Sequence, residues 1–184
     1  MLEHVPTWLG AMLHNVRAGH ARLAAVDPAL TSDTVIELSS PAFASGARLP
    51  ERFTADGVGV SPPLIWGDVP AATRSLVLIV EDPDAPAPRP LVHAIVAGVS
   101  PEIRQFAEGT IVADGAGDLI SGDVGRNSFF SEGWLPPDPP SGHGEHDYAF
   151  QLFALSEELD LDANPGRGAL VAAMAGKVIG LGLL

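Results

Sequence analysis

The chain has 184 residues, of which 23 are acidic and 10 are basic, so its formal net charge at pH 7 is −13 with histidines counted as neutral. This charge repels nucleic acid backbones and anionic lipid headgroups, so we expect no nucleic acid partner. The absence of cysteine excludes a disulfide framework, a thiolate metal site and a cysteine nucleophile, and the length fits one domain with a sizeable core.

The N-terminal region carries apolar residues at spacings of three and four, which predicts an amphipathic helix over residues 2–16. The residues of this stripe are Leu2, Val5, Leu9, Met12 and Val16, widened by Trp8 and Leu13. The helix packs either on its own domain or on a second subunit. Because an exposed apolar stripe is better explained by a partner than by solvent, we expect a homodimer. The N-terminus lacks the positive region of a secretory signal, so we expect a cytoplasmic protein.

Beyond residue 28 the chain changes to short runs rich in Val, Ile, Leu and Phe, separated by Gly, Pro, Asp and Ser. This pattern predicts a β-sheet with polar turns. The predicted strands are residues 34–39, 75–81, 92–99 and 147–155. Residues 76–80 are apolar throughout, so we expect that strand to be central and buried on both faces. The prolines and glycines gather in residues 61–63, 82–90 and 136–144, which predicts rigid loops there.

The most apolar stretch of the chain is its C-terminal end, residues 168–184. It has Lys177 near its centre and is shorter than the ~20 apolar residues that a spanning helix needs. We therefore interpret it as core and expect no integral membrane segment. Residues 168–176 are predicted to form a short helix, and residues 177–184 a final strand.

Two of the proline-rich loops carry polar side chains at the ends of predicted strands. Asp82 and Asp84 directly follow a buried strand, His146 and Tyr148 directly precede another, and His93 lies at the start of a third. We expect these side chains to converge on a site. Each also has an ordinary alternative: the aspartates as turn formers, His93 as a satisfied core histidine and Tyr148 as a core aromatic.

The ordered set of motifs closely resembles the phosphatidylethanolamine-binding protein family, also called Raf kinase inhibitor-like proteins. The motifs are Ser61-Pro62-Pro63-Leu64-Ile65-Trp66, Val69-Pro70, Thr73-Arg74-Ser75, Asp82-Pro83-Asp84-Ala85-Pro86, His93, Pro136-Pro137-Asp138-Pro139-Pro140-Ser141-Gly142 and His146-Asp147-Tyr148. The resemblance covers about residues 35–184. It implies a β domain over residues 31–184, and residues 1–30 look like the helical extension of some bacterial members.

The resemblance implies a mainly β fold, in which a large antiparallel sheet packs on a smaller sheet with peripheral helices. It also implies a shallow pocket for phosphate-like and carboxylate anions. Asp82 and Asp84 match the family's Asp-Pro-Asp motif, His93 its first pocket histidine, and His146 and Tyr148 its His-Arg-Tyr motif. The family places a cis bond where this chain has Ala85-Pro86.

The chain departs from the family pattern at several positions. Val92 replaces an aromatic residue, Asp147 replaces the arginine of the His-Arg-Tyr motif, and Pro136 replaces a glycine. Asp138 lies where a backbone N–H faces the anion in relatives, so its carboxylate is expected to narrow the pocket or to repel the anion. We expect Asp82, Asp84, His93, Asp138, His146 and Tyr148 to bind the ligand.

The chemistry of these side chains is that of an anion site. Protonated imidazoles and a phenol O–H donate to anion oxygens, and carboxylates that bond the histidines favour their charged form. At least one of Asp82 and Asp84 is expected to act from behind, orienting His93 or a backbone N–H. Binding is therefore expected to weaken as pH rises.

The predicted function is the binding of a small anionic ligand, such as a phospholipid headgroup or a phosphate- or carboxylate-bearing metabolite, with regulation of a partner protein as its effect. One alternative is a metal-dependent hydrolase that uses the Asp and His side chains. The other is an inhibitor of proteases or kinases. Because neither a metal-ligand motif nor a nucleophile elbow is found, we expect no catalytic residues, metal or cofactor.

Overall fold

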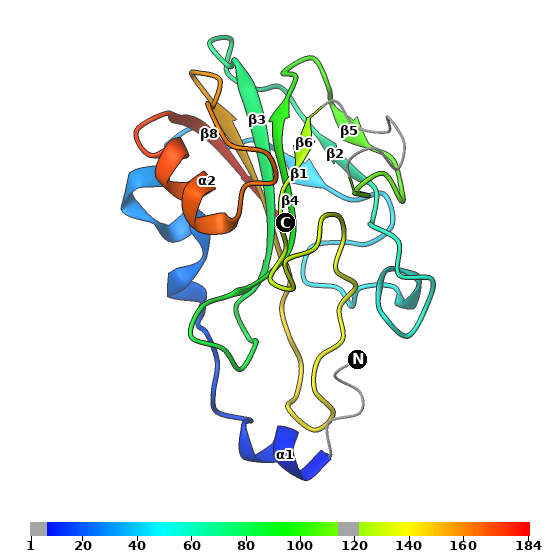
Figure 1. Ribbon diagram of the computed structural model, residues 1–184. Helices are drawn as coiled ribbons and strands as arrows, with labels where there is room; N and C mark the ends of the chain where they lie inside the picture. Colours follow the sequence, from blue (N-terminus) through cyan, green and yellow to red (C-terminus); the bar gives the residue numbers. More distant parts are fainter. Residues whose placement is uncertain (1–6, 114–121) are drawn as a thin grey trace.

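The computed structural model describes residues 7–113 and 122–184, and two antiparallel sheets dominate it, as the sequence predicts (Figure 1). The five-stranded sheet has the order β6-β4-β3-β7-β8, and the three-stranded sheet has the order β1-β2-β5. The larger sheet comprises β3 (Ser75–Asp82), β4 (Leu91–Val99), β6 (Asp123–Val124), β7 (Ala149–Leu155) and β8 (Val178–Leu183). The smaller sheet comprises β1 (Leu38–Ser39), β2 (Leu64–Trp66) and β5 (Gln105–Phe106).

The helices of the described chain are short and peripheral. They are α1 (Thr7–Met12), α2 (Arg167–Met174) and the 3-10 turns η2 (His20–Arg22), η3 (Ala24–Val26), η4 (Pro28–Leu30) and η5 (Glu51–Phe53). Within the described ranges, no helix combines the length and apolarity that a membrane crossing requires.

The central strand β3 is buried along its whole length, which confirms the prediction from its continuous apolar run. Side chains of a strand alternate between the two faces of the sheet. Leu76 and Leu78 therefore pack on the smaller sheet, against residues such as Leu64. Val77 and Ile79 pack in a second core on the opposite face.

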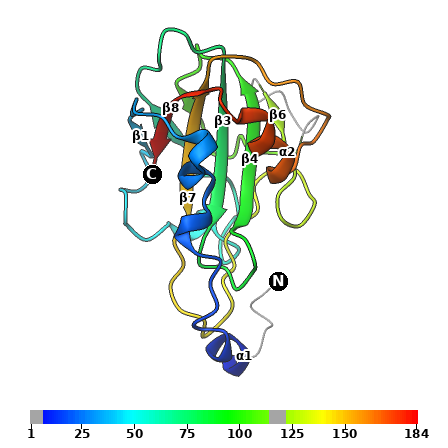
Figure 2. The same ribbon diagram turned by 90° about the vertical axis from the view of Figure 1, so that its left-hand side faces the viewer.

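That second core is covered by α2 and by the turns η3 and η4, which lie over the sheet in Figure 2. Leu170 of α2 and Leu30 of η4 are fully buried in it, as is Ala24 of η3. Residues 24–30 are thus packed into the core of the β domain.

The predicted long strands and the C-terminal helix are present, whereas the N-terminal helix is shorter than predicted. Helix α1 ends at Met12, followed by a turn, and residues 1–6 lie outside the described ranges. The carbonyls of Leu13 and Val16 accept hydrogen bonds from the His143 ring, so a contact with a distant loop replaces the last helical turns. The expectation of a cis peptide bond before Pro86 is wrong, since the peptide bonds of the described residues are all trans.

The antiparallel pairing places the polar loops at one edge of the larger sheet. Strand β3 ends at Asp82, which pairs with Leu91 at the start of β4, and Glu81 pairs with Ala149 at the start of β7. The loops that follow β3 and precede β7 therefore project from the same edge, with α1 beyond them (Figure 1).

Candidate functional site

The fold brings the predicted site residues together at this edge. The His146 ring lies against the Asp82 carboxylate, the His93 and Tyr148 rings meet edge to face at 5.2 Å between centroids, and Asp84 bonds the backbone of the His146 loop. Four of these side chains are largely withdrawn from solvent: Asp82, Asp84, His93 and His146.

Asp82 holds both the loop that follows it and the histidine opposite. Its Oδ1 accepts hydrogen bonds from the backbone N–H groups of Asp84 and Ala85, at 2.8 and 3.0 Å. Its Oδ2 lies 2.7 Å from Nδ1 of His146. Asp82 therefore orients two backbone N–H groups of the loop that follows it.

His143, which the sequence analysis did not single out, extends this arrangement by a second imidazole. Its Nδ1 lies 2.7 Å from Nε2 of His146, and its Nε2 lies 2.8 Å from the carbonyl oxygen of Leu13. The ring is fully buried. The only signal for it in the sequence is a histidine three residues before His146 in a glycine-rich loop.

The contacts from Asp82 through His146 to His143 form a continuous row that ends at the N-terminal segment. The carbonyl of Leu13 can only accept, so His143 donates to it from Nε2. The row therefore connects the Asp82 carboxylate to Leu13 through two imidazole rings.

His93 presents a different arrangement, because one ring nitrogen is bonded and the other is not. Its Nδ1 donates to the carbonyl oxygen of Leu135 at 2.7 Å, whereas its Nε2 is buried and has no hydrogen-bond partner among the described residues. Burial lowers the pKa of His93, against the opposing effects of the Leu135 bond and of the Asp82 charge. In the neutral ring, Nε2 carries an unshared electron pair that can accept a hydrogen bond.

Tyr148 adds a hydroxyl that stays protonated. Burial raises its pKa well above the ordinary value of 10.0, and the charges of Asp82, Asp138 and Asp84 raise it further. The phenol is therefore a permanent donor. Asp138 is near enough for its charge to act on this ring, and it is half-buried in the proline-rich loop.

Asp84 faces basic side chains from the N-terminal segment. Its Oδ1 lies 2.5 Å from Nη1 of Arg17, and its Oδ2 accepts the backbone N–H of Asp147 at 2.8 Å. Burial acts to raise the pKa of Asp84, but the Asp147 hydrogen bond, Arg17 and His20 outweigh it and hold that pKa below its usual value. No local pattern in the sequence pointed to Arg17, because it is brought to the site from 67 positions along the chain.

A group with metal-ligand chemistry lies at the outer side of Asp84. Ligand atoms of His20, Asp84 and Asp147 all lie within 4.8 Å of one another. The side chains of His20 and Asp147 are 58% and 78% exposed, and Arg17 already bonds one oxygen of Asp84. This group differs from the set expected for a hydrolase, since it lacks Asp82, His93 and His146.

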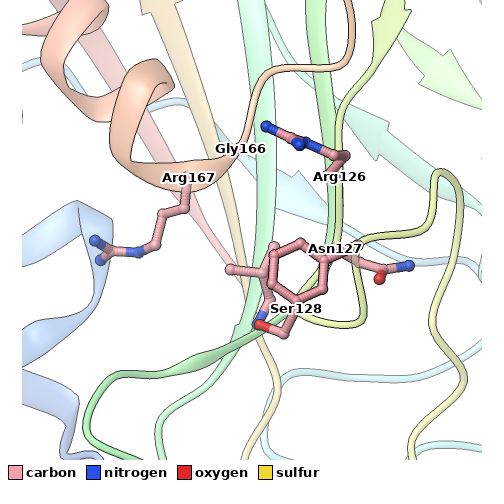
Figure 3. Close-up of a pocket in the computed structure, with 7 residues that line it drawn as sticks. Arg126, Asn127, Ser128, Gly166 and Arg167 are labelled. Atoms are coloured by element: carbon pink, nitrogen blue, oxygen red, sulfur yellow. The ribbon is translucent and has the colours of Figure 1, made fainter.

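A cavity of about 270 Å³ lies on the other face of β4 (Figure 3). It is lined by Val92, Arg126, Asn127, Ser128, Phe130, Gly166 and Arg167. Neighbouring residues of a strand point to opposite faces, so Val92 faces this cavity and His93 faces the predicted site. The Arg167 guanidinium bonds Glu81 and the carbonyl of Arg22, which directs it away from the cavity.

The family model for phosphatidylethanolamine-binding proteins matches residues 39–184 of this chain. The UPF0098 protein of Methanothermobacter thermautotrophicus is 39% identical over 146 residues, which cover 79% of this chain and 93% of that protein. The UPF0098 protein of Aquifex aeolicus is 36% identical over 146 residues, which cover 79% of this chain and 83% of that protein.

Two solved structures share the fold. A phosphatidylethanolamine-binding protein homolog from Chlamydia trachomatis has a TM-score of 0.73 and 35% identity, covering 83% of this chain and 95% of that chain. YbcL of E. coli, described as a new member of the mammalian family, has a TM-score of 0.75 and 25% identity. The match covers 81% of this chain and 94% of that chain. The matched sequence and the shared fold show that this chain belongs to the phosphatidylethanolamine-binding protein family.

Proposed function

We propose that this chain binds small anionic ligands, phosphate- or carboxylate-bearing, in the site formed by Asp82, Asp84, His93, Asp138, His146 and Tyr148. The observation that carries the proposal is the buried Nε2 of His93, which has no hydrogen-bond partner within residues 7–113 and 122–184. A buried polar atom without a partner costs free energy, and a ligand oxygen there would remove that cost.

The protonation of His93 couples ligand binding to pH. In the neutral ring Nε2 is an acceptor, so a fully ionised oxygen would be repelled from it. Binding therefore requires one proton, delivered either by protonation of His93 or by a monoprotonated phosphate. We expect affinity to fall by up to about tenfold for each unit by which pH rises above the relevant pKa.

Asp82 does not prevent anion binding, because both of its oxygens already have partners within the site. Its Oδ1 accepts two backbone N–H groups, and its Oδ2 lies 2.7 Å from Nδ1 of His146. The Asp84 carboxylate faces Arg17 at 2.5 Å. The phenol of Tyr148 remains as a donor. A small anion can thus approach His93 without meeting an unpaired carboxylate at Asp82 or Asp84.

The test is a titration of the full chain with inorganic phosphate, monitored by the ring nitrogen resonances of His93 and by thermal unfolding. His93→Asn is the informative variant, because its amide can keep the bond to the Leu135 carbonyl while it lacks Nε2. We expect saturable stabilisation of wild type, a shift of Nε2 toward its protonated value, and loss of both in His93→Asn. At one hundred times the dissociation constant, phosphate would add about 2.7 kcal/mol of stability.

Arg126→Ala is the control for phosphate that binds in the cavity on the opposite face of β4. A phosphate effect that Arg126→Ala removes and His93→Asn keeps would overturn the proposal. A zinc titration with and without chelator tests the hydrolase alternative. A chelator-sensitive gain with zinc that Asp147→Asn removes, with no effect of phosphate, would place a metal at His20, Asp84 and Asp147 instead.

We further propose that the chain is a homodimer that regulates a partner protein. The support is a set of exposed apolar side chains on the N-terminal segment: Trp8 is 64%, Met12 72% and Val16 46% exposed. Sedimentation equilibrium tests this proposal: wild type should sediment as a dimer and Trp8→Ser/Met12→Ser as a monomer. A monomeric wild type would contradict it. A cytoplasmic location stays a prediction of the sequence.

A further inference from the structure

We propose that residues 7–19 form a clasp that holds the anion site closed, and that a ligand must displace this clasp to bind. The inference rests on the proposed anion site and adds its regulation. The clasp lies outside residues 39–184, the part of the chain that matches the family model.

The C-terminal part of the clasp is bonded to the loop that follows β3. The backbone N–H of Ala18 donates to the carbonyl of Ala85 at 3.0 Å, and that of Gly19 donates to the carbonyl of Pro83 at 2.7 Å. Arg17 bonds the Asp84 carboxylate between these two contacts. Every residue from Pro83 to Ala85 thus has a partner in the clasp.

The middle of the clasp is bonded to the loop that precedes β7. The buried His143 ring donates from Nε2 to the carbonyls of Leu13 and Val16, at 2.8 and 3.1 Å. The His14 ring donates from Nδ1 to the carbonyl of His143 at 2.7 Å. Arg17 also donates to the carbonyl of Glu145 at 3.1 Å. Arg17 therefore joins both loops that carry the site.

The backbone of helix α1 packs directly against the backbone of the loop that precedes β7. A Cβ added at Gly10 would lie 2.1 Å from the carbonyl oxygen of Ser141, and one added at Gly142 would lie 2.7 Å from that of Thr7. Such separations are possible only because both residues are glycines. The contact also gives a way to displace the clasp without changing any charge.

In the clasped state the site is withdrawn from solvent, but one of its buried polar atoms has unused hydrogen-bonding capacity. The side chain of His146 is 1% exposed and that of Asp82 is 5% exposed, whereas Nε2 of His93 lacks a partner in the part of the chain that the structure describes. The two loops must separate for a phosphate-sized group to reach that nitrogen. The apparent dissociation constant is then the intrinsic constant divided by the fraction of molecules with an open clasp. Weakening the clasp should therefore tighten ligand binding.

The first test uses Gly10→Ala, with Gly168→Ala as the matched control, because a Cβ at Gly168 meets no atom within 4 Å. Inorganic phosphate is titrated into each full-length variant, and circular dichroism verifies the fold. We expect Gly10→Ala to lower the apparent dissociation constant about fivefold and Gly168→Ala to leave it at the wild-type value.

The second test uses Arg17→Ala, with Arg22→Ala as its control for the loss of a positive charge. Arg22 lies just beyond the clasp and its guanidinium bonds the carbonyl of Pro88, not a carboxylate. A direct ligand contact by Arg17 would make Arg17→Ala bind phosphate more weakly. The clasp predicts the opposite sign, again about fivefold tighter than wild type.

A third readout follows the clasp itself in wild type. Saturating phosphate should speed the hydrogen exchange of the Ala18 and Gly19 amides, which donate to the first loop in the closed state. Unchanged or slower exchange at both amides overturns the clasp.

The outcomes separate the clasp from the anion site. Tighter binding in Gly10→Ala and Arg17→Ala, with both controls at the wild-type value, supports the clasp. If Gly10→Ala and Arg17→Ala bind phosphate as wild type does or more weakly, and His93→Asn does not bind it, the clasp is overturned and the anion site stays in place. No saturable phosphate effect in wild type or in either clasp variant overturns both proposals.

Discussion

His93 makes the stability of this protein depend on pH near neutrality. Burial lowers its pKa below the ordinary value of 6.5, so the unfolded chain binds this proton at a higher pH than the folded chain does. Stability therefore falls as pH decreases below about 6.5 and is fully retained above it. Urea unfolding between about pH 5 and pH 7.5 should show a steeper decline for wild type than for His93→Asn. Equal slopes would contradict a neutral His93.

Asp84 makes stability depend on pH in the same direction as His93, but in a separate and more acidic pH range. Its pKa is held below the ordinary value of 3.8, so its contribution to stability is present above that value and is lost as pH falls through the lowered pKa. We expect Asp84→Asn to flatten the unfolding free energy below about pH 4 and to leave the slope near pH 6 as in wild type. A change of slope near pH 6 would assign that range to Asp84 rather than to His93.

At the residue scale, the sequence predicted the side chains that lie next to strand ends and missed those brought from elsewhere. Asp82, His93 and Tyr148 flank continuous apolar runs, so their convergence followed from the antiparallel sheet. Arg17 and His143 became part of the site through contacts between distant segments, which no local spacing encodes.

At the element scale, Glu81 ties three elements to the central strand. Its carboxylate is fully buried and accepts hydrogen bonds from Arg167 of α2, from the N–H of Ala24 in η3 and from the Gln151 amide in β7. The Arg167 guanidinium also bonds the carbonyl of Arg22. A buried carboxylate is tolerated here because all of its contacts are donors.

Removing the charge of Glu81 should therefore be costly. Glu81→Gln keeps the shape but turns an amide N–H toward Arg167, so we expect a loss of about 2 to 4 kcal/mol in the free energy of unfolding by urea. Glu157→Gln is the control, because Glu157 is 66% exposed and lies 3.6 Å from Lys177. The free energy of unfolding of Glu157→Gln should stay within about 0.5 kcal/mol of that of wild type. Similar losses in both variants would show that the Glu81 network does not hold these elements.

The elements that were predicted correctly are those with long apolar runs. Strands β3, β4 and β7 have seven to nine residues each, and their composition alone indicates a sheet. Strands β5 and β6 have two residues each, too few to show an alternation, whereas β1 is formed by the last two residues of the strand predicted over residues 34–39. The prediction extended helix α1 beyond its end. Apolar spacing does not reveal that the carbonyls of Leu13 and Val16 accept hydrogen bonds from the distant His143 ring.

At the scale of the whole molecule, the proposed site is a local exception in a chain with net charge −13. Fixed charges beyond about 8 Å are screened at physiological ionic strength, whereas the groups that touch the ligand are not. Surface acidic residues should therefore oppose an approaching anion mainly at low salt. They should not alter the contacts that it makes once bound.

This balance gives phosphate binding a salt dependence opposite to that of a basic surface. Raising ionic strength from about 20 mM to about 200 mM with a salt of a bulky anion should strengthen phosphate binding by wild type, because the repulsion is screened. Neutralising two remote acids, as in Glu157→Gln/Glu158→Gln, should strengthen binding at low salt and reduce this dependence. Both glutamates are exposed and lie in the segment after β7. Weaker phosphate binding at high salt in wild type would instead indicate an exposed basic site, and the cavity beside Arg126 would become the place to look for it.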